Sequence, residues 1–274
     1  MDGSGTSMGG PPKRPGIAEP SATVWRAWGS IAQRWRNLDP IQGEVFPKKP
    51  NGEVCTKGKQ MPMGLMLYFL RHGETTASLT GGYCGALDPD LTPAGYEMAR
   101  DFAAAYRDLA WEAVFCSPLK RAVATAQPLC EAVGLTPHLR DGLKEIAYGR
   151  WEGRTPQEVN LEFHDEYVRW VADPGWNAPT GGEKGVDIAR RSSLVVEEIE
   201  RTHPSGNVLV VSHKATVRVM LCSLLGIDVG RYRERLSMPV AALSIVEMTE
   251  QGPLLRVLGD RAHLRQSLRL EPGE

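Results

Sequence analysis

Residues 65–74 read LMLYFLRHGE, and this stretch decides how the rest of the chain is interpreted. Its first six residues form an unbroken apolar run, which is typical of a strand that is buried on both faces of a parallel sheet. The run leads directly into Arg71, His72, Gly73 and Glu74. Because open α/β sheets bind ligands at the carboxyl ends of their strands, we expect these four residues to lie at a functional edge.

Further apolar runs alternate with amphipathic helical patterns along the chain. Strands are predicted at residues 113–117, 208–212, 241–248 and 253–259, and helices at residues 93–109, 120–133, 156–171, 183–202 and 215–226. This alternation predicts an α/β fold over residues 65–270, a three-layer sandwich in which helices flank a mostly parallel central sheet.

Three of the predicted strands end near residues that suit phosphate chemistry. Arg71 and His72 follow the first strand, Arg121 comes just after the strand at 113–117, and His213 follows the strand at 208–212. Arginine offers planar, bidentate donors to phosphate oxygens and keeps its charge. A neutral imidazole is abundant near pH 7 and can carry a phosphoryl group transiently. These residues therefore predict a phosphate cage.

Four segments carry a resemblance to a known family. They are RHGETTASLTGGYCGALDPDLTPAG (71–95), CSPLKRAVATA (116–126), LKEIAYGRWEG (143–153) and VSHKATVR (211–218). In this order they resemble the sequence blocks of the histidine phosphatase superfamily, whose best-known members are the cofactor-dependent phosphoglycerate mutases.

The resemblance implies a metal-independent enzyme that needs no cofactor and acts through a phosphohistidine. It makes His72 the nucleophile and Glu145 the proton donor to the leaving alkoxide. It makes Arg71 and Arg121 the pair that clamps the phosphate, with His213 as a further phosphate contact. The expected partner is a small-molecule phosphate ester.

Several positions depart from the family pattern and bear on the substrate. Ser78 stands where many relatives have asparagine, and its hydroxyl is expected to contact the phosphate less well. Tyr83 and Cys84 occupy positions that vary with substrate, although Cys84 also suits a small apolar filler. Lys214 replaces the usual glycine after the second histidine; it either binds a second anionic group, such as a carboxylate, or points to solvent.

The favoured function is hydrolysis of a small phosphorylated metabolite, and two alternatives stay open. One is a phosphoglycerate mutase that uses the same site. The other is a non-catalytic module that binds a phosphorylated ligand or a protein partner. A mutase must keep water from the phosphohistidine. Only 67 residues separate Glu145 from His213, which leaves little chain for an enclosing cap and favours hydrolysis.

Composition limits the other functions of the chain. The 32 basic residues nearly balance the 33 acidic ones, so there is no general attraction to nucleic acid or a membrane surface. The chain contains neither a long uncharged apolar run nor a signal-peptide pattern. Its five scattered cysteines lack a CxxC pair, which is typical of a cytoplasmic protein with no zinc site. The oligomeric state stays open.

Residues 1–64 differ from the rest in composition. They contain 10 glycines and 8 prolines, which predicts a disordered N-terminal extension. Within it, Trp25, Trp28 and Trp35 stand at near-helical spacing. The segment is interpreted as a helix that docks on a partner or membrane, as a segment that lies on the chain's own domain, or as sequence upstream of a true start near Met61.

Overall fold

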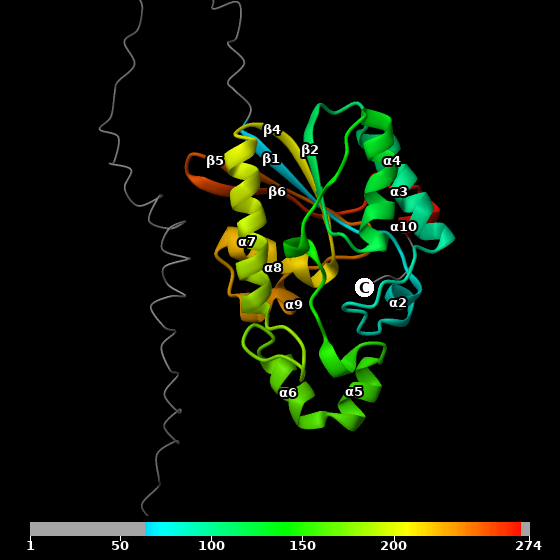
Figure 1. Ribbon diagram of the computed structural model, residues 1–274, viewed down its shortest axis with the longest axis vertical. Coiled ribbons are helices and arrows are strands. Elements are labelled where there is room, and N and C mark those ends of the chain that lie inside the picture. Colours follow the sequence, from blue (N-terminus) through cyan, green and yellow to red (C-terminus); the bar gives the residue numbers. More distant parts are fainter. Residues whose placement is uncertain (1–63, 270–274) are drawn as a thin grey trace, which may run out of the picture. The chain divides into compact units, whose positions relative to one another are not determined.

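The computed structural model describes residues 64–269, in which helices lie on both faces of a central sheet (Figure 1). The six strands are β1 (Leu65–Arg71), β2 (Trp111–Cys116), β3 (His138–Leu139), β4 (Gly206–Ser212), β5 (Leu243–Thr249) and β6 (Gly252–Asp260). Their order in the sheet is β3-β2-β4-β1-β5-β6. The first four strands are parallel, whereas β5 is antiparallel to both β1 and β6. The predicted α/β sandwich is confirmed, with antiparallel strands at one edge.

The helices follow the predicted patterns closely. They are α2 (Thr76–Thr80), α3 (Pro93–Tyr106), α4 (Lys120–Val133), α5 (Pro156–Glu162), α6 (His164–Ala172), α7 (Gly185–Thr202), α8 (Lys214–Leu225), α9 (Tyr232–Arg235) and α10 (Gln266–Arg269). Helix α3 begins as expected, because the Thr92 side chain caps it and proline occupies its first turn. It ends three residues before the predicted boundary.

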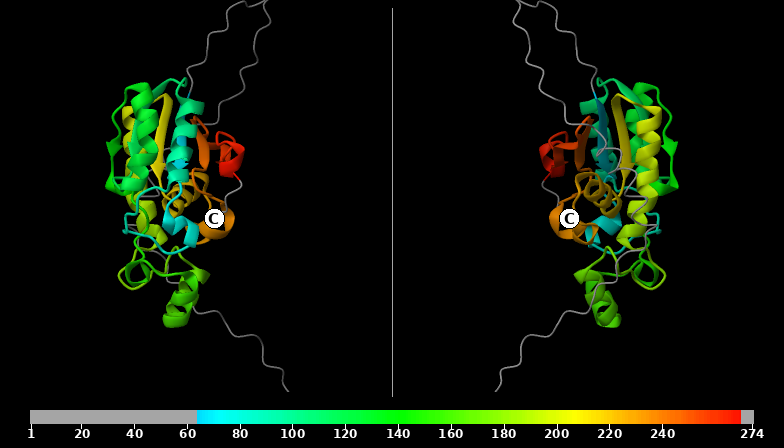
Figure 2. Two further views of the ribbon diagram at one scale, coloured as in Figure 1. Left: turned by 90° about the vertical axis from the view of Figure 1, so that its right-hand side faces the viewer. Right: turned by 90° about the vertical axis from the view of Figure 1, so that its left-hand side faces the viewer.

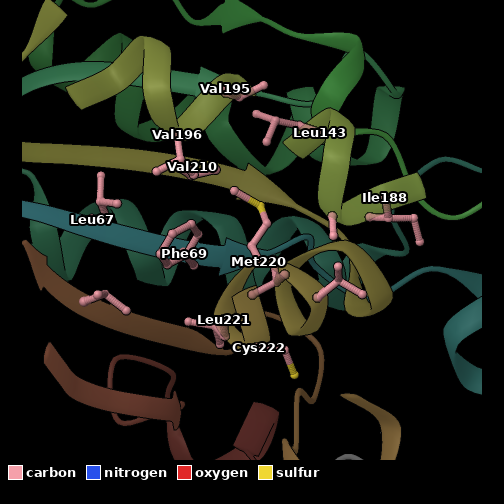
Figure 3. Close-up of a cluster of buried hydrophobic side chains, with 14 of the residues drawn as sticks. Leu67, Phe69, Leu143, Ile188, Val195, Val196, Val210, Met220, Leu221 and Cys222 are labelled. Atoms are coloured by element: carbon pink, nitrogen blue, oxygen red, sulfur yellow. The ribbon is translucent and has the colours of Figure 1, made fainter. Parts of the chain in front are cut away.

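The core consists of two apolar layers that the sheet separates. Leu67 and Phe69 of β1 face α7 and α8, as Figure 3 shows, whereas the alternate residues Tyr68 and Leu70 face α3 and α4. Successive side chains of a strand point to opposite faces, so a strand covered on both faces needs an apolar residue at every position. This explains the unbroken apolar run of β1.

Helices α5 and α6 lie at the end of the molecule toward which β1 runs (Figures 1 and 2). Trp151 and Trp170 anchor them in a small aromatic cluster that also contains Tyr83. The rings of Trp151 and Trp170 meet edge to face, with centroids 5.3 Å apart. This cluster joins α6 to the loops beyond the carboxyl ends of the strands.

The predicted N-terminal extension, including Trp25, Trp28 and Trp35, lies outside the described residues except for Gly64. In the described range, 64–269, no helix is both long enough and apolar enough to cross a membrane.

His263 is only partly exposed, whereas His138 and His164 are exposed. Both ring nitrogens of His263 are buried. Its ring packs against Phe102, with centroids 5.4 Å apart. Burial lowers the pKa of His263 to about 4, because the charged imidazolium is poorly solvated there.

Acidification is expected to destabilise the protein through His263. Its pKa is about 4 in the folded state and about 6.5 in an unfolded chain, so the unfolded state binds more protons between these values. The stabilisation is therefore complete above pH 6.5 and is lost as the pH falls toward 4. The contribution to the free energy of unfolding should decrease by about 2 kcal/mol from pH 7 to pH 5.

Urea unfolding of His263→Leu and of the exposed control His138→Gln measures this contribution. His263→Leu should lose less stability than the wild-type chain between pH 7 and pH 5, whereas His138→Gln should match the wild type. Equal losses in all three proteins would contradict the assignment.

Candidate active site

The predicted cage residues meet at the carboxyl ends of β2, β4 and β1, which are neighbours in the sheet. Arg71 is the last residue of β1 and His72 follows it, His213 follows β4, and Arg121 lies in the first turn of α4. All four side chains are buried. The rings of the two histidines lie 5.2 Å apart, measured between centroids. Residues up to 142 positions apart in the sequence therefore share one site.

The orientation of His72 leaves one ring nitrogen available for attack. Its Nδ1 lies 2.7 Å from the carbonyl oxygen of Gly73. Because a carbonyl can only accept a hydrogen bond, Nδ1 carries the proton and Nε2 keeps its lone pair. Burial, together with the charges of Arg71 and Arg121, holds the pKa of His72 well below its ordinary value. The imidazole is thus neutral at pH 7.

Glycine is required at position 73 by the close approach of two backbone segments. A Cβ atom there would lie 2.6 Å from the carbonyl oxygen of Gly95, and one on Gly95 would lie 2.2 Å from that of Glu74. The amide of Gly73 donates to the Thr125 hydroxyl at 2.9 Å, and that hydroxyl donates to the Arg121 carbonyl at 2.7 Å. Thr125 was missed in the sequence; its spacing of four residues from Arg121 on one helix was the available signal.

The guanidinium of Arg121 is oriented by the loop before α3. Its Nη1 donates to the carbonyl of Leu87 at 2.7 Å and its Nη2 to that of Gly85 at 3.1 Å. Asp88 lies 3.4 Å from Nη1. The remaining Nε is buried and has no hydrogen-bond partner in the described part of the chain.

Arg71 is held from the other side of the site. Its Nη1 donates to the carbonyl of Met238 at 2.6 Å. Burial lowers the pKa of Arg71 to about 10, which still leaves it charged at pH 7.

His213 is held by a residue that was not predicted. Its Nε2 lies 2.7 Å from the hydroxyl of Ser117, which directly follows β2. Its Nδ1 is buried and makes no hydrogen bond to any described residue. Burial, followed by the nearby charge of Arg121, keeps the pKa of His213 well below its ordinary value. Nδ1 is therefore the nitrogen left to contact a phosphate group.

The carboxyl group of Glu145 lies at the N-terminus of α8. Its Oε1 accepts from the amides of Ile146 at 3.0 Å and Thr216 at 3.3 Å, and its Oε2 accepts from Ala215 at 3.4 Å. The first amides of a helix have no partner within the helix, and the oxygens of Glu145 accept hydrogen bonds from two of them. Helix α8 thus links Glu145 to His213, the residue that precedes the helix.

An arginine on α7 holds the loop that carries Glu145. Arg191 donates to the carbonyl of Gly142 at 2.7 Å and to that of Glu145 at 3.2 Å. It also pairs with Glu183 at 3.0 Å, and the carboxylate of Glu183 accepts from the amide of Ala147. The sequence contained no signal for this arrangement, because its members come from separate segments.

Other predicted contacts have structural settings of their own. The Ser78 hydroxyl donates to the carbonyl of Thr75 at 2.8 Å and accepts from its amide, so it closes the capping box of α2. The ring of Tyr83 packs on that of Tyr148, with centroids 4.7 Å apart. Cys84 is half-buried, its thiol donates to the carbonyl of Leu87, and burial raises its pKa. The substrate or phosphate roles of Ser78, Tyr83 and Cys84 stay predictions.

Lys214 begins α8 and is half-buried. Its role as a reader of a second anionic group also stays a prediction. Over residues 64–269, no group of three or more His, Cys, Asp and Glu side chains could hold a metal ion.

A neutral histidine beside two arginines, at the carboxyl edge of a parallel sheet, is suited to an enzyme of phosphoryl transfer. Residues 67–261 match the histidine phosphatase superfamily, branch 1. The chain belongs to this superfamily, and the predicted resemblance is confirmed.

Individual relatives are named as phosphatases. Phosphoserine phosphatase 1 of Hydrogenobacter thermophilus is 32% identical over 198 residues, covering 72% of this chain and 93% of the relative. The adenosylcobalamin/alpha-ribazole phosphatase of Salmonella typhimurium is 28% identical over 208 residues, covering 72% of this chain and 98% of the relative. The structure of a mycobacterial glucosyl-3-phosphoglycerate phosphatase in complex with VO3 has a TM-score of 0.66 at 28% identity, covering 72% of this chain and 99% of that one. This chain is a phosphatase of the same superfamily.

Proposed function

We propose that His72 and Glu145 carry out the hydrolysis of a phosphate monoester in two steps. The observation that carries this proposal is the hydrogen bond from His72 Nδ1 to the Gly73 carbonyl, which leaves Nε2 unprotonated inside the cage. In the first step Nε2 attacks phosphorus, the bond to the ester oxygen breaks, and Glu145 gives its proton to the departing oxygen. The product alcohol then leaves.

The second step returns the enzyme to its starting state. Water attacks phosphorus, the bond from phosphorus to Nε2 breaks, and Glu145 takes a proton from the attacking water. Inorganic phosphate then leaves, and it carries the oxygen of water in place of the ester oxygen that left with the alcohol. Arg71, Arg121 and Nδ1 of His213 hold the equatorial oxygens, on which charge is spread in both steps.

The region beyond the sheet edge supports hydrolysis over mutase activity. Between Glu145 and His213, α7 packs in the core on one face of the sheet, so that only α5, α6 and their flanking loops are left to cover the site. These helices have 7 and 9 residues. Such a short cover admits water to the phosphohistidine.

Incubation with 3-phosphoglycerate and 2,3-bisphosphoglycerate tests this distinction. We expect inorganic phosphate as the main product and little 2-phosphoglycerate, because water reaches the phosphoenzyme. Rapid formation of 2-phosphoglycerate with negligible phosphate release would establish a mutase. Absence of both products, and of phosphate release from other esters such as p-nitrophenyl phosphate, would favour the non-catalytic alternative.

The substrate is proposed to be the phosphate ester of a small organic alcohol, as the names of the relatives suggest for those proteins. The cytoplasmic location is also a proposal, and it rests on the scattered cysteines of the sequence.

A further inference from the structure

Arg218, in the second turn of α8, is a cation that forms no ion pair with an acidic side chain of the described residues. Its side chain is half-buried, and it makes no hydrogen bond or ion pair to any residue in the range 64–269. Its Nε is fully buried and has no hydrogen-bond partner among the described residues. Burial lowers the pKa of Arg218, and Tyr232, Tyr148 and Glu145 lie close enough to counteract this. A buried guanidinium nitrogen without a hydrogen bond is costly unless a ligand supplies an acceptor.

The hydroxyl of Tyr232 is a second unused donor in the same place. Tyr232 begins α9, which packs against α8, and its side chain is only 1% exposed. Its hydroxyl is buried and has no hydrogen-bond partner in the described structure. Burial raises the pKa of this phenol, and the charges of Arg233, Glu145 and Arg218 act on it as well. Tyr232 therefore keeps its proton at pH 7 and can donate it in a hydrogen bond.

Both groups lie on the Glu145 side of the phosphate cage. The carboxyl group of Glu145 is bound by amides in the first turn of α8, and Arg218 follows in the next turn. Arg218 is also close enough to Arg71 to contribute to the lowered pKa of that residue. Two cations at this separation repel each other, and an anion between or beside them relieves the repulsion.

No acidic side chain of residues 64–269 forms an ion pair with Arg218. The charge of Glu145 acts on Arg218, but both oxygens of Glu145 already accept hydrogen bonds from the α8 amides. Arg233 of α9 is a further neighbour and adds positive charge. Its guanidinium lies over the ring of Trp170, with Cζ 4.1 Å from the ring centroid. The surroundings therefore suit an anionic group that residues 64–269 do not provide.

We infer that Arg218 and Tyr232 bind a carboxylate on the alcohol portion of the substrate. This inference rests on the proposed function, because that function places the departing oxygen next to Glu145 and hence the alcohol portion beside Arg218. The planar guanidinium fork matches the two oxygens of a carboxylate, and the Tyr232 hydroxyl adds a third donor. The substrate class is thus a phosphomonoester of a small hydroxy acid. Arg218, one turn beyond Lys214, is the principal reader of its carboxylate.

Two matched pairs of esters test this class in the full-length enzyme. 3-Phosphoglycerate and glycerol 3-phosphate share one skeleton but differ by a carboxylate in place of a hydroxymethyl group. Phosphoserine and phosphoethanolamine differ by the carboxylate alone. The wild-type enzyme should have the higher kcat/KM for the carboxylated member of each pair. Equal values, or a higher kcat/KM for the member without a carboxylate, would overturn the inference.

Arg218→Gln should lower kcat/KM for the carboxylated esters by about 10- to 100-fold, chiefly through KM, because it removes a charge-assisted bidentate hydrogen bond. Glycerol 3-phosphate, phosphoethanolamine and p-nitrophenyl phosphate should change by less than about threefold. Arg218→Lys keeps the charge but loses the planar fork, so its KM should be intermediate. Tyr232→Phe should show a smaller selective loss in the same direction.

Arg190→Gln is the matched control, because it removes the same charge from an exposed position on α7. Its kcat/KM for each of the five esters should equal that of the wild-type enzyme. Equal losses on both members of each pair in Arg218→Gln and Tyr232→Phe would indicate a structural role and overturn the inference, as would no loss on either. Phosphate release from p-nitrophenyl phosphate by the wild-type enzyme separates the two proposals. If the enzyme hydrolyses this ester but shows no preference for carboxylated esters, only the inference about Arg218 and Tyr232 fails. If it hydrolyses no ester, the proposed function fails as well.

Discussion

Replacement of His72 by asparagine is expected to reduce the rate of phosphate release from every ester by at least about 10⁴-fold. Without the imidazole nucleophile, no phosphohistidine can form. The asparagine amide can still donate to the Gly73 carbonyl, so the backbone around the site should keep its shape. Initial rates of phosphate release measure the loss. Circular dichroism and the midpoint of urea unfolding then show whether the fold is retained.

Trapping the phosphoenzyme identifies the residue that is modified. Wild-type protein that is mixed with a ³²P-labelled ester and quenched in alkali should carry label on His72, and His72→Asn should carry none. His164→Asn is the matched control, because His164 lies exposed on α6, where its ring forms a hydrogen bond with Asn160. It should retain both activity and label. Activity within tenfold of wild type in His72→Asn, or label on another residue, would contradict the mechanism.

The second large effect is expected at Glu145 and should depend on the leaving group. Glu145→Gln preserves the side-chain shape and one acceptor for the amides of α8, but it cannot deliver a proton. General acid catalysis contributes about 10² to 10⁴-fold when the departing oxygen needs a proton. Hydrolysis of an alkyl phosphate should therefore fall by about this factor. Hydrolysis of p-nitrophenyl phosphate, whose leaving group is stable as an anion, should fall far less.

A series of aryl and alkyl phosphates measures how steeply the reaction rate depends on the leaving group. The rate of formation of the phosphoenzyme should depend more steeply on the pKa of the leaving alcohol in Glu145→Gln than in the wild type. Glu247→Gln, on β5, serves as the control and should have the wild-type slope. An equal reduction for all leaving groups would show that Glu145 positions other residues and does not transfer a proton.

Much of the candidate site could be proposed from the sequence, because its residues are concentrated in short contiguous blocks. Strand β1 and the residues Arg71 and His72 are adjacent in the sequence, so one apolar run followed by a polar motif located both. The same holds for β4 and His213. The fold class followed from periodicity, because strands buried on both faces and helices packed on one face leave different patterns of apolar residues.

The contacts that orient these residues were not predictable in the same way. Ser117 and Thr125 hold His213 and the Gly73 backbone, respectively, yet each stands in the sequence as an ordinary small polar residue. Ser78 shows the converse, since its hydroxyl is engaged in the cap of α2. Hydrogen-bond partners depend on distances between segments, and single-residue patterns do not contain those distances.

The sequence by itself determined the class of this protein: an α/β sheet whose strand ends carry a histidine, two arginines and a second histidine. This was possible because the spacing of apolar residues and the short motifs can be recognised within one strand or a few helical turns. Only the tertiary structure decided that Nε of Arg218 and the hydroxyl of Tyr232 are buried near Glu145 with no partner among residues 64–269, and that the ring nitrogens of His263 are buried. Burial and electrostatic environment result from the packing of α8, α9 and the C-terminal segment against one another and the sheet, and such packing brings together residues that are far apart in the chain.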